Sequence, residues 1–188
     1  GKDKMSDFEG YSKEILESAK AFLEKAKGFD ESNVFARQAH LRSAIMQGFC
    51  FLEAHLNYIC DHFSESETLD LLERGLLGER DVRLIDGEFC LSKIRKMYSI
   101  EDRISFLLRK FSGLKYSGTN FAWKGPLSDA IKIRNSLTHP RERLVLQIND
   151  VEMALQAVLD ATNGLYTAVF KRPLPYAKLG LMSQRPFD

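Results

Sequence analysis

A short segment near the C-terminal third of the chain combines three side chains that can act together on a phosphate group. Arg134, Asn135 and His139 follow one another closely and directly precede Pro140. Arginine offers a fixed fork of donors for phosphate oxygens, histidine titrates near neutral pH and can move a proton, and asparagine can hold a hydroxyl group. The set suits attack of a ribose 2′-hydroxyl on its neighbouring phosphate, which needs a base and charge stabilisation but no metal.

The rest of the chain offers no competing catalytic motif. It contains no phosphate-binding glycine loop, dinucleotide fingerprint, paired-histidine zinc motif or nucleophile elbow. His40, His55 and His62 lack ligand spacing, and helical geometry places the first and last away from the apolar stripe and His55 at its edge, so we expect surface positions. Cys50 and Cys60 are expected to be buried thiols. We therefore expect no metal and no other cofactor.

Composition indicates an ordinary globular chain of 188 residues, with 44% hydrophobic and 28% charged residues. The formal net charge is +1, so any anion site must arise from local arrangement. No apolar run reaches the roughly 20 residues that cross a bilayer, and the N-terminus has no signal-peptide core. We expect a cytoplasmic protein with no membrane partner.

Helical periodicity dominates the elements that must position the segment. A capping box at Ser6 predicts a first helix that ends near Gly28. Cap residues before Val34 predict a long second helix whose apolar stripe extends to Phe63. We expect further helices over 66–77, over 88–98 and after Ser99, followed by a loop over 112–125 in which Phe121 and Trp123 are packing anchors.

The segment itself is expected at the end of a helix that begins near Pro126. This helix should stop at Thr138 or His139, because a residue before proline avoids the helical region. Asn149 or Asp150 caps a last helix. No strand alternation or internal repeat is apparent. We therefore predict an all-α helical bundle of four core helices plus short extra helices, with a single domain over 1–170 and an extended C-terminal tail over 171–188.

These residues resemble those of a known superfamily. The segment Arg134–His139 resembles the R-x(4–6)-H signature of HEPN domains, where the residue after the arginine is often Asn, Asp or His. Glu53 and Asn57 on the second helix resemble the Glu-x-x-x-Asn feature of the bacterial RiboL-PSP and related HEPN groups. The resemblance implies a helical bundle, usually a homodimer with the two motifs facing each other. Many such domains are metal-independent endoribonucleases in toxin–antitoxin, abortive-infection and CRISPR systems, whereas others only bind RNA or nucleotide or serve a partner protein.

Roles for individual residues follow from the resemblance and from proximity in sequence. Arg134, Asn135 and His139 are the expected catalytic residues; the expected orienting residues are Glu53, Asn57 and Thr138; the expected phosphate-binding residues are Lys132, Arg141 and Arg143. Two structural interpretations stay open. Arg134 and His139 can each serve a purely structural role, in an ion pair with an acidic group or in a helix C-cap, and Glu53 and Asn57 can make a helix-to-helix hydrogen bond.

Helix geometry adds a constraint on the expected site. Arg134 and His139 are five positions apart, so an ideal helix directs them about 140° apart. Either the helix ends between them or a second chain completes the site. We expect a homodimer that acts on RNA, with an antitoxin or a nucleotidyltransferase as a possible further partner. The alternatives are a dimeric module that binds RNA or nucleotide without cleaving it, and a purely structural helical dimer.

Overall fold

The computed structural model describes residues 2–187, so Gly1 and Asp188, the outer ends of the predicted domain and tail, lie outside it. The chain divides into two compact units, which are described one at a time. The first unit comprises Gly1–Leu52 and Asn120–Asp188, and the second comprises Glu53–Thr119. Helix α2 (Val34–Phe63) contributes its first part to the first unit and its remainder to the second.

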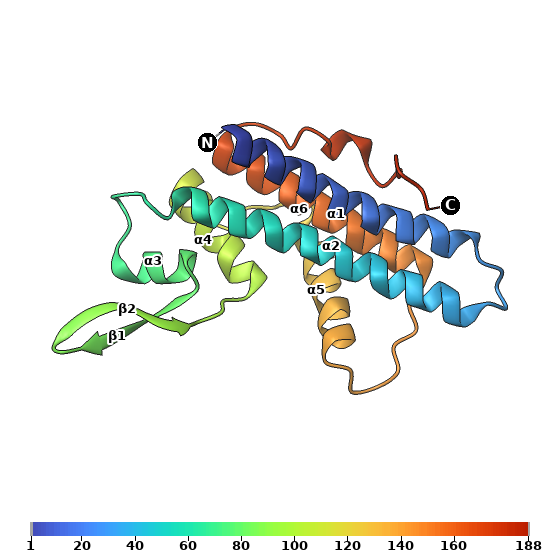
Figure 1. Ribbon diagram of the computed structural model, residues 1–188, viewed down its shortest axis with the longest axis horizontal. Helices are drawn as coiled ribbons and strands as arrows, with labels where there is room; N and C mark the ends of the chain where they lie inside the picture. Colours follow the sequence, from blue (N-terminus) through green and yellow to red (C-terminus); the bar gives the residue numbers. More distant parts are fainter. Residues whose placement is uncertain (1, 188) are drawn as a thin grey trace. The chain divides into compact units, whose positions relative to one another are not determined.

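The first unit is built on long helices that lie side by side (Figure 1). Helix α6 (Ile148–Phe170) packs against α1 (Lys2–Gly28) and α5 (Lys124–Thr138). Helix α2 approaches α6 so closely at Gly48 that any Cβ there would overlap the Leu155 side chain. The apolar stripes of these helices form the core, with residues such as Leu16, Leu23, Leu41, Ile45, Leu127, Val151, Val158 and Leu165 almost fully buried.

The ends of these helices test the predicted boundaries. Helix α1 ends at Gly28 as expected but begins at Lys2, so the predicted capping box at Ser6 is wrong and Ser6 lies inside the helix. Helix α5 ends at Thr138, which confirms the predicted stop before Pro140. The predicted packing role of Phe121 and Trp123 is confirmed, since their rings stack with centroids 4.8 Å apart and Trp123 is buried.

The last residues of the chain return along α1 (Figure 1). They include a short 3-10 helix, Ala177–Leu179, and two buried side chains, Leu174 and Tyr176. The Tyr176 hydroxyl lies 3.3 Å from the Ser12 hydroxyl, and burial raises the pKa of Tyr176 to about 12. The Glu17 carboxylate accepts a hydrogen bond from the Gln184 backbone N–H at 2.8 Å. These contacts give the tail defined partners on α1.

The second unit contains a β-hairpin where the sequence predicted a helix. After α3 (Leu71–Leu77), strands β1 (Arg80–Ile85) and β2 (Glu88–Arg95) pair in antiparallel fashion, so the helix predicted over 88–98 is wrong. Asp86 and Gly87 both have positive φ, 51° and 87°, as the tight turn of a two-residue hairpin requires. This Asp-Gly pair is the sequence signal that could have revealed the hairpin.

One face of the hairpin is apolar along both strands. It carries the cross-strand pairs Val82 with Leu91 and Leu84 with Phe89. The base of this face lies against α3 at Gly75, while Leu84 and Phe89 near the turn stay exposed. The last helix of the unit is α4 (Ile100–Ser112), which begins after Ser99 as predicted, and the Ser99 hydroxyl caps it by accepting a hydrogen bond from the Asp102 N–H.

The fold is therefore mostly helical but not strictly all-α. The described residues form six α-helices, one 3-10 helix and one two-stranded hairpin. None of the helices in residues 2–187 combines the length and apolar character that a membrane-spanning helix needs.

Several side chains of α2 and nearby helices depart from their predicted exposure. Cys50 is exposed, although Cys60 is buried as expected. His55 is 1% exposed rather than at the surface, and this burial lowers its pKa to about 4. His62 is exposed as predicted, whereas His40 is half-buried with its ring edge-on to Phe29. The position of a residue on one helix does not show which side chains from other elements will cover it.

Candidate functional site

The motif residues lie at the end of α5, where helical hydrogen bonding stops. The His139 N–H donates to the Asn135 carbonyl at 2.9 Å, which closes the last turn. The Thr138 hydroxyl donates to the carbonyls of Arg134 and Asn135, at 3.1 and 3.3 Å. Thr138 therefore adds side-chain hydrogen bonds to carbonyls of the last turn and ties itself to the turn that carries His139.

Asn135 and His139 share an open cleft. The cleft has a volume of about 540 Å³ and is lined by Asn135, Ser136, His139, Arg141, Glu142 and Leu144. The side chains of Asn135 and His139 are both exposed to solvent. Their spacing of four residues puts them on one face of the helix. The cleft can therefore offer an amide, an imidazole and a guanidinium to a ligand that enters it.

Arg134 has different surroundings, and its side chain is not part of the cleft lining. It is half-buried, and its guanidinium carbon lies 5.3 Å from the centre of the Phe49 ring on α2. A guanidinium over an aromatic face is a favourable cation–π arrangement. Within one chain, the structure brings Asn135 and His139 together but holds Arg134 on another side of α5. This agrees with the angular separation predicted from helix geometry.

The three predicted phosphate-binding residues are spread along this end of the unit. Lys132 lies 3.5 Å from Asp129, and both side chains are 76% exposed, so the pair is weakly held. Arg141 lines the cleft with His139. Arg143 lines a second cleft of about 360 Å³, together with Val34, Phe35, Gln38, Arg42, Leu144 and Val145. Leu144 belongs to both clefts, so they adjoin each other.

A side-chain amide that the sequence analysis missed fixes the segment between α5 and α6. Gln38 on α2 donates to the Leu146 carbonyl and accepts from the Leu146 N–H, each at 2.8 Å. Both groups are buried, so the paired bonds define the path of this segment. The sequence carried a signal, because Gln38 is a polar residue in helical register with the buried Leu41 and Ile45.

Glu53 and Asn57 belong to the second unit, whereas the motif residues belong to the first. The Asn57 side-chain oxygen accepts a hydrogen bond of 2.6 Å from Arg103 on α4. This is the helix-to-helix bond that the sequence left open as an alternative. Arg103 also lies 3.7 Å from the Cys60 sulfur, and burial raises the pKa of that thiol. Glu53 is half-buried on the same helix.

Among the residues described, no group of three or more His, Cys, Asp or Glu side chains is placed to hold a metal ion. Comparison of the chain with protein-family models, with curated proteins and with solved structures finds no match. The function must therefore be inferred from the geometry and chemistry of the residues.

Proposed function

We propose that this protein is a HEPN-type, metal-independent endoribonuclease that acts as a homodimer in the cytoplasm. The observation that carries the proposal is the open cleft at the end of α5, where His139 and Asn135 meet Arg141. The resemblance of Arg134–His139 to the HEPN signature supplies the substrate class, RNA. The mostly helical fold is compatible with that superfamily.

The proposed reaction needs only groups that this chain carries. His139 takes the proton from a ribose 2′-hydroxyl, whose oxygen then attacks the adjacent phosphorus. The bond from phosphorus to the 5′-oxygen breaks, and that oxygen takes a proton from a protonated His139 of the second copy or from water. The products are a 2′,3′-cyclic phosphate and a 5′-hydroxyl. Arg141 and Arg134 offset the charge that builds up on the phosphate oxygens, and Asn135 positions the ribose.

The need for a second copy follows from the position of Arg134. Its guanidinium lies against Phe49 and not in the cleft lining. In a dimer with the two α5 ends adjacent, the Arg134 side chain of one copy can serve the cleft of the other. A toxin-like role, held in check by an antitoxin or by a nucleotidyltransferase partner, is part of this proposal and comes from the resemblance alone.

The same position of Arg134 favours a second candidate function. If Arg134 keeps its place on Phe49 when RNA is bound, the cleft has a base but lacks one of its charge stabilisers. The protein would then be a dimeric HEPN module that binds RNA or nucleotide and serves a partner protein. Tight binding of RNA without product over hours is the behaviour that this function predicts.

The first test is incubation of the purified protein with end-labelled RNA in EDTA. Wild type is expected to cleave, leaving 2′,3′-cyclic phosphate ends, and His139→Ala is expected to lower the rate by about 10²- to 10⁴-fold because general acid–base catalysis is lost. His62→Ala is the matched control, since His62 is also exposed but lies in the second unit.

Each outcome of this test separates the two functions. Cleavage in EDTA that depends on His139 and not on His62 supports the ribonuclease. Cleavage that requires added Mg²⁺, or that His139→Ala leaves unchanged, contradicts the mechanism. Binding without cleavage by the wild-type dimer, across several RNAs, favours the binding module.

A further inference from the structure

The second cleft, next to the motif cleft, has an unusual lining for a protein surface. Phe35, in the first turn of α2, is 81% exposed. Val34 and Val145 beside it are 48% and 49% exposed. All three are apolar, and all three line the cleft. Exposed apolar groups that gather at one place mark a binding surface more often than singly scattered ones.

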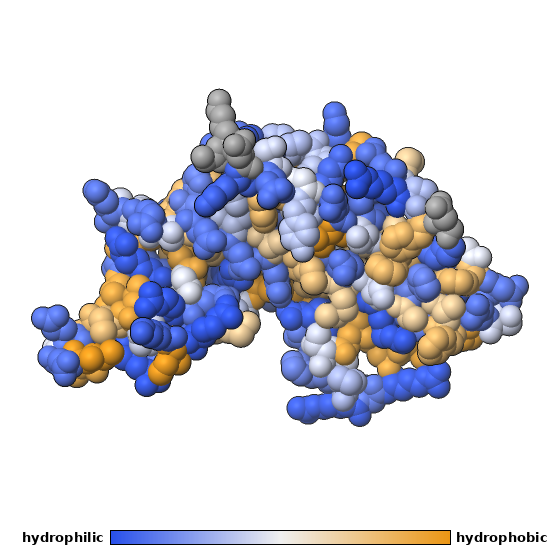
Figure 2. Space-filling model, in the orientation of Figure 1, coloured by the Kyte–Doolittle hydropathy of each residue, from blue (hydrophilic) through white to orange (hydrophobic). Residues whose placement is uncertain are grey.

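The charged residues of the same cleft are all of one sign. Arg42 and Arg143 are both exposed, and no carboxylate is among the residues that line this cleft. Figure 2 shows hydrophobic and hydrophilic residues interleaved where α2 begins and where the segment after α5 returns. An exposed aromatic ring and guanidinium groups in one cleft are the combination by which proteins hold single-stranded nucleic acid: the ring stacks on a base and the cations hold the phosphates.

One wall of the second cleft is held by hydrogen bonds, and the cleft adjoins the one that contains His139. Gln38 lines it and clasps the backbone of Leu146, which holds the segment carrying Arg143 against α2. Leu144 is shared with the cleft that contains His139. A chain of nucleotides that places one phosphate beside His139 can therefore continue into the second cleft.

We infer that this second cleft is a nucleotide subsite for single-stranded RNA. The base of a nucleotide neighbouring the scissile bond stacks on Phe35, and its phosphate is held by Arg42 and Arg143. The inference rests on the proposed function for its ligand class, but it concerns binding and does not require cleavage. Because stacking needs no particular base edge, the subsite selects unpaired RNA over duplex without reading its sequence.

The test measures binding of the full chain to a fluorescent single-stranded oligonucleotide with 2′-O-methyl riboses, which cannot undergo 2′-hydroxyl attack. Phe35→Ala is expected to weaken binding by about fivefold or more, the effect of losing one base stack. Binding of an abasic oligonucleotide of the same length is expected to be unchanged by this variant. Phe35→Tyr keeps an aromatic face and should restore the affinity.

Matched controls come from equally exposed residues elsewhere. Phe89→Ala removes a ring that is 71% exposed on the hairpin, and it should leave binding unchanged. Arg42→Gln and Arg143→Gln should each reduce the magnitude of the slope of log affinity against log salt concentration by about one. Arg172→Gln also removes an exposed arginine, and it should leave this slope unchanged. Analytical ultracentrifugation of each variant reports the oligomeric state.

The outcomes distinguish this inference from the catalytic proposal. Phe35-dependent binding without any RNA cleavage supports the subsite and counts against the ribonuclease. RNA cleavage together with equal affinities of wild type, Phe35→Ala and Phe89→Ala overturns the subsite and leaves the ribonuclease standing. The inference is also overturned if wild type binds no oligonucleotide, or if Phe35→Ala converts a dimer to a monomer, since a second copy then covers the ring.

Discussion

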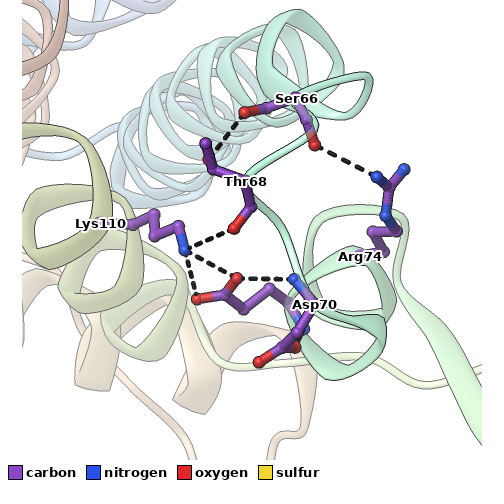
Figure 3. Close-up of polar contacts among 6 residues, drawn as sticks. Ser66, Thr68, Asp70, Arg74 and Lys110 are labelled. Carbon is purple, nitrogen blue, oxygen red and sulfur yellow. Dashed lines mark hydrogen bonds and ion pairs between the residues drawn. The ribbon is translucent and has the colours of Figure 1, made fainter.

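Two groups of polar side chains, one in each unit, differ in whether they bond to each other or face solvent. At the end of α5 in the first unit, Asn135, His139 and Arg141 face an open cleft and are exposed to solvent. In the second unit the Lys110 ammonium donates to both carboxylate oxygens of Glu73, each at 2.8 Å, and to the Thr68 carbonyl at 3.1 Å (Figure 3).

Glu73 also completes a capping box at the start of α3. Its carboxylate accepts from the Asp70 N–H at 2.9 Å, and the Asp70 carboxylate accepts from the Glu73 N–H at 2.8 Å (Figure 3). One side chain thus caps α3 and ties it to α4. Polar groups that satisfy each other stabilise a fold, whereas polar groups left facing water are available to a ligand.

The largest expected stability effect is at Arg103, whose side chain is 6% exposed and lies 3.5 Å from Glu79 as well as bonding Asn57. Arg103→Met removes a buried guanidinium together with its hydrogen bond to Asn57 and its ion pair with the half-buried Glu79, and it should lower the free energy of unfolding by about 3 kcal/mol. Arg172→Met is the matched control: Arg172 is exposed and lies in the first unit, so its loss should change the free energy of unfolding by no more than about 0.5 kcal/mol. Urea unfolding measures both, and equal losses would contradict the contrast.

A pH effect is expected at His55, the buried imidazole of the second unit. Its pKa is about 4 when folded, against 6.5 as the ordinary value. The unfolded chain therefore binds a proton below about pH 6.5 that the folded chain rejects, so the contribution of His55 to stability falls as the pH drops from about 6.5 to about 4 and is constant below. The contribution approaches about 3 kcal/mol.

His55→Gln cannot titrate and should lose this part of the pH dependence. Urea unfolding at several pH values between 4 and 7 measures it, and His62→Gln serves as the control because that ring is exposed. If the free energy of unfolding of His55→Gln depends on pH as steeply as that of wild type, His55 is protonated without cost in the folded state.

The smallest expected effect concerns two ion pairs, one in each unit. Glu73→Gln weakens the pair with Lys110 while keeping a capping oxygen, and it should cost about 0.5–1 kcal/mol. Asp129→Asn removes the 3.5 Å pair with Lys132, whose two side chains are 76% exposed, and it should change stability very little. Thermal unfolding of both variants at low and high salt makes the measurement. A larger loss of stability for Asp129→Asn than for Glu73→Gln would contradict the expected difference between the two ion pairs.

The long helices were predictable because their apolar stripes repeat over many turns. The limits of α2 and the end of α5 followed from caps and from Pro140. The hairpin was missed because charged residues interrupt both strands and most of its surface is solvated, which hides the alternation. The Asp86–Gly87 turn was the stronger signal, and it was outweighed by the helical character of the surrounding chain.

The candidate site was predictable in part. The spacing of Asn135 and His139 placed them on one face, and the angle between Arg134 and His139 indicated that one straight helix does not direct both to one place. The sequence could not indicate that Phe35 and Arg143 line the same cleft, since they are distant in sequence. Such proximity depends on how the chain returns after α5, which the buried amide of Gln38 determines.

That amide also bears on how this protein can diversify. Because Gln38 makes its hydrogen bonds to main-chain atoms of Leu146, these bonds do not depend on the identity of the neighbouring side chains. The stretch between Thr138 and Leu146 is therefore held at both ends, by the end of α5 and by the two hydrogen bonds of Gln38. Substitution of its exposed residues Arg141 and Arg143 is therefore expected to change the proposed ligand preferences of the two clefts more than the stability of the fold.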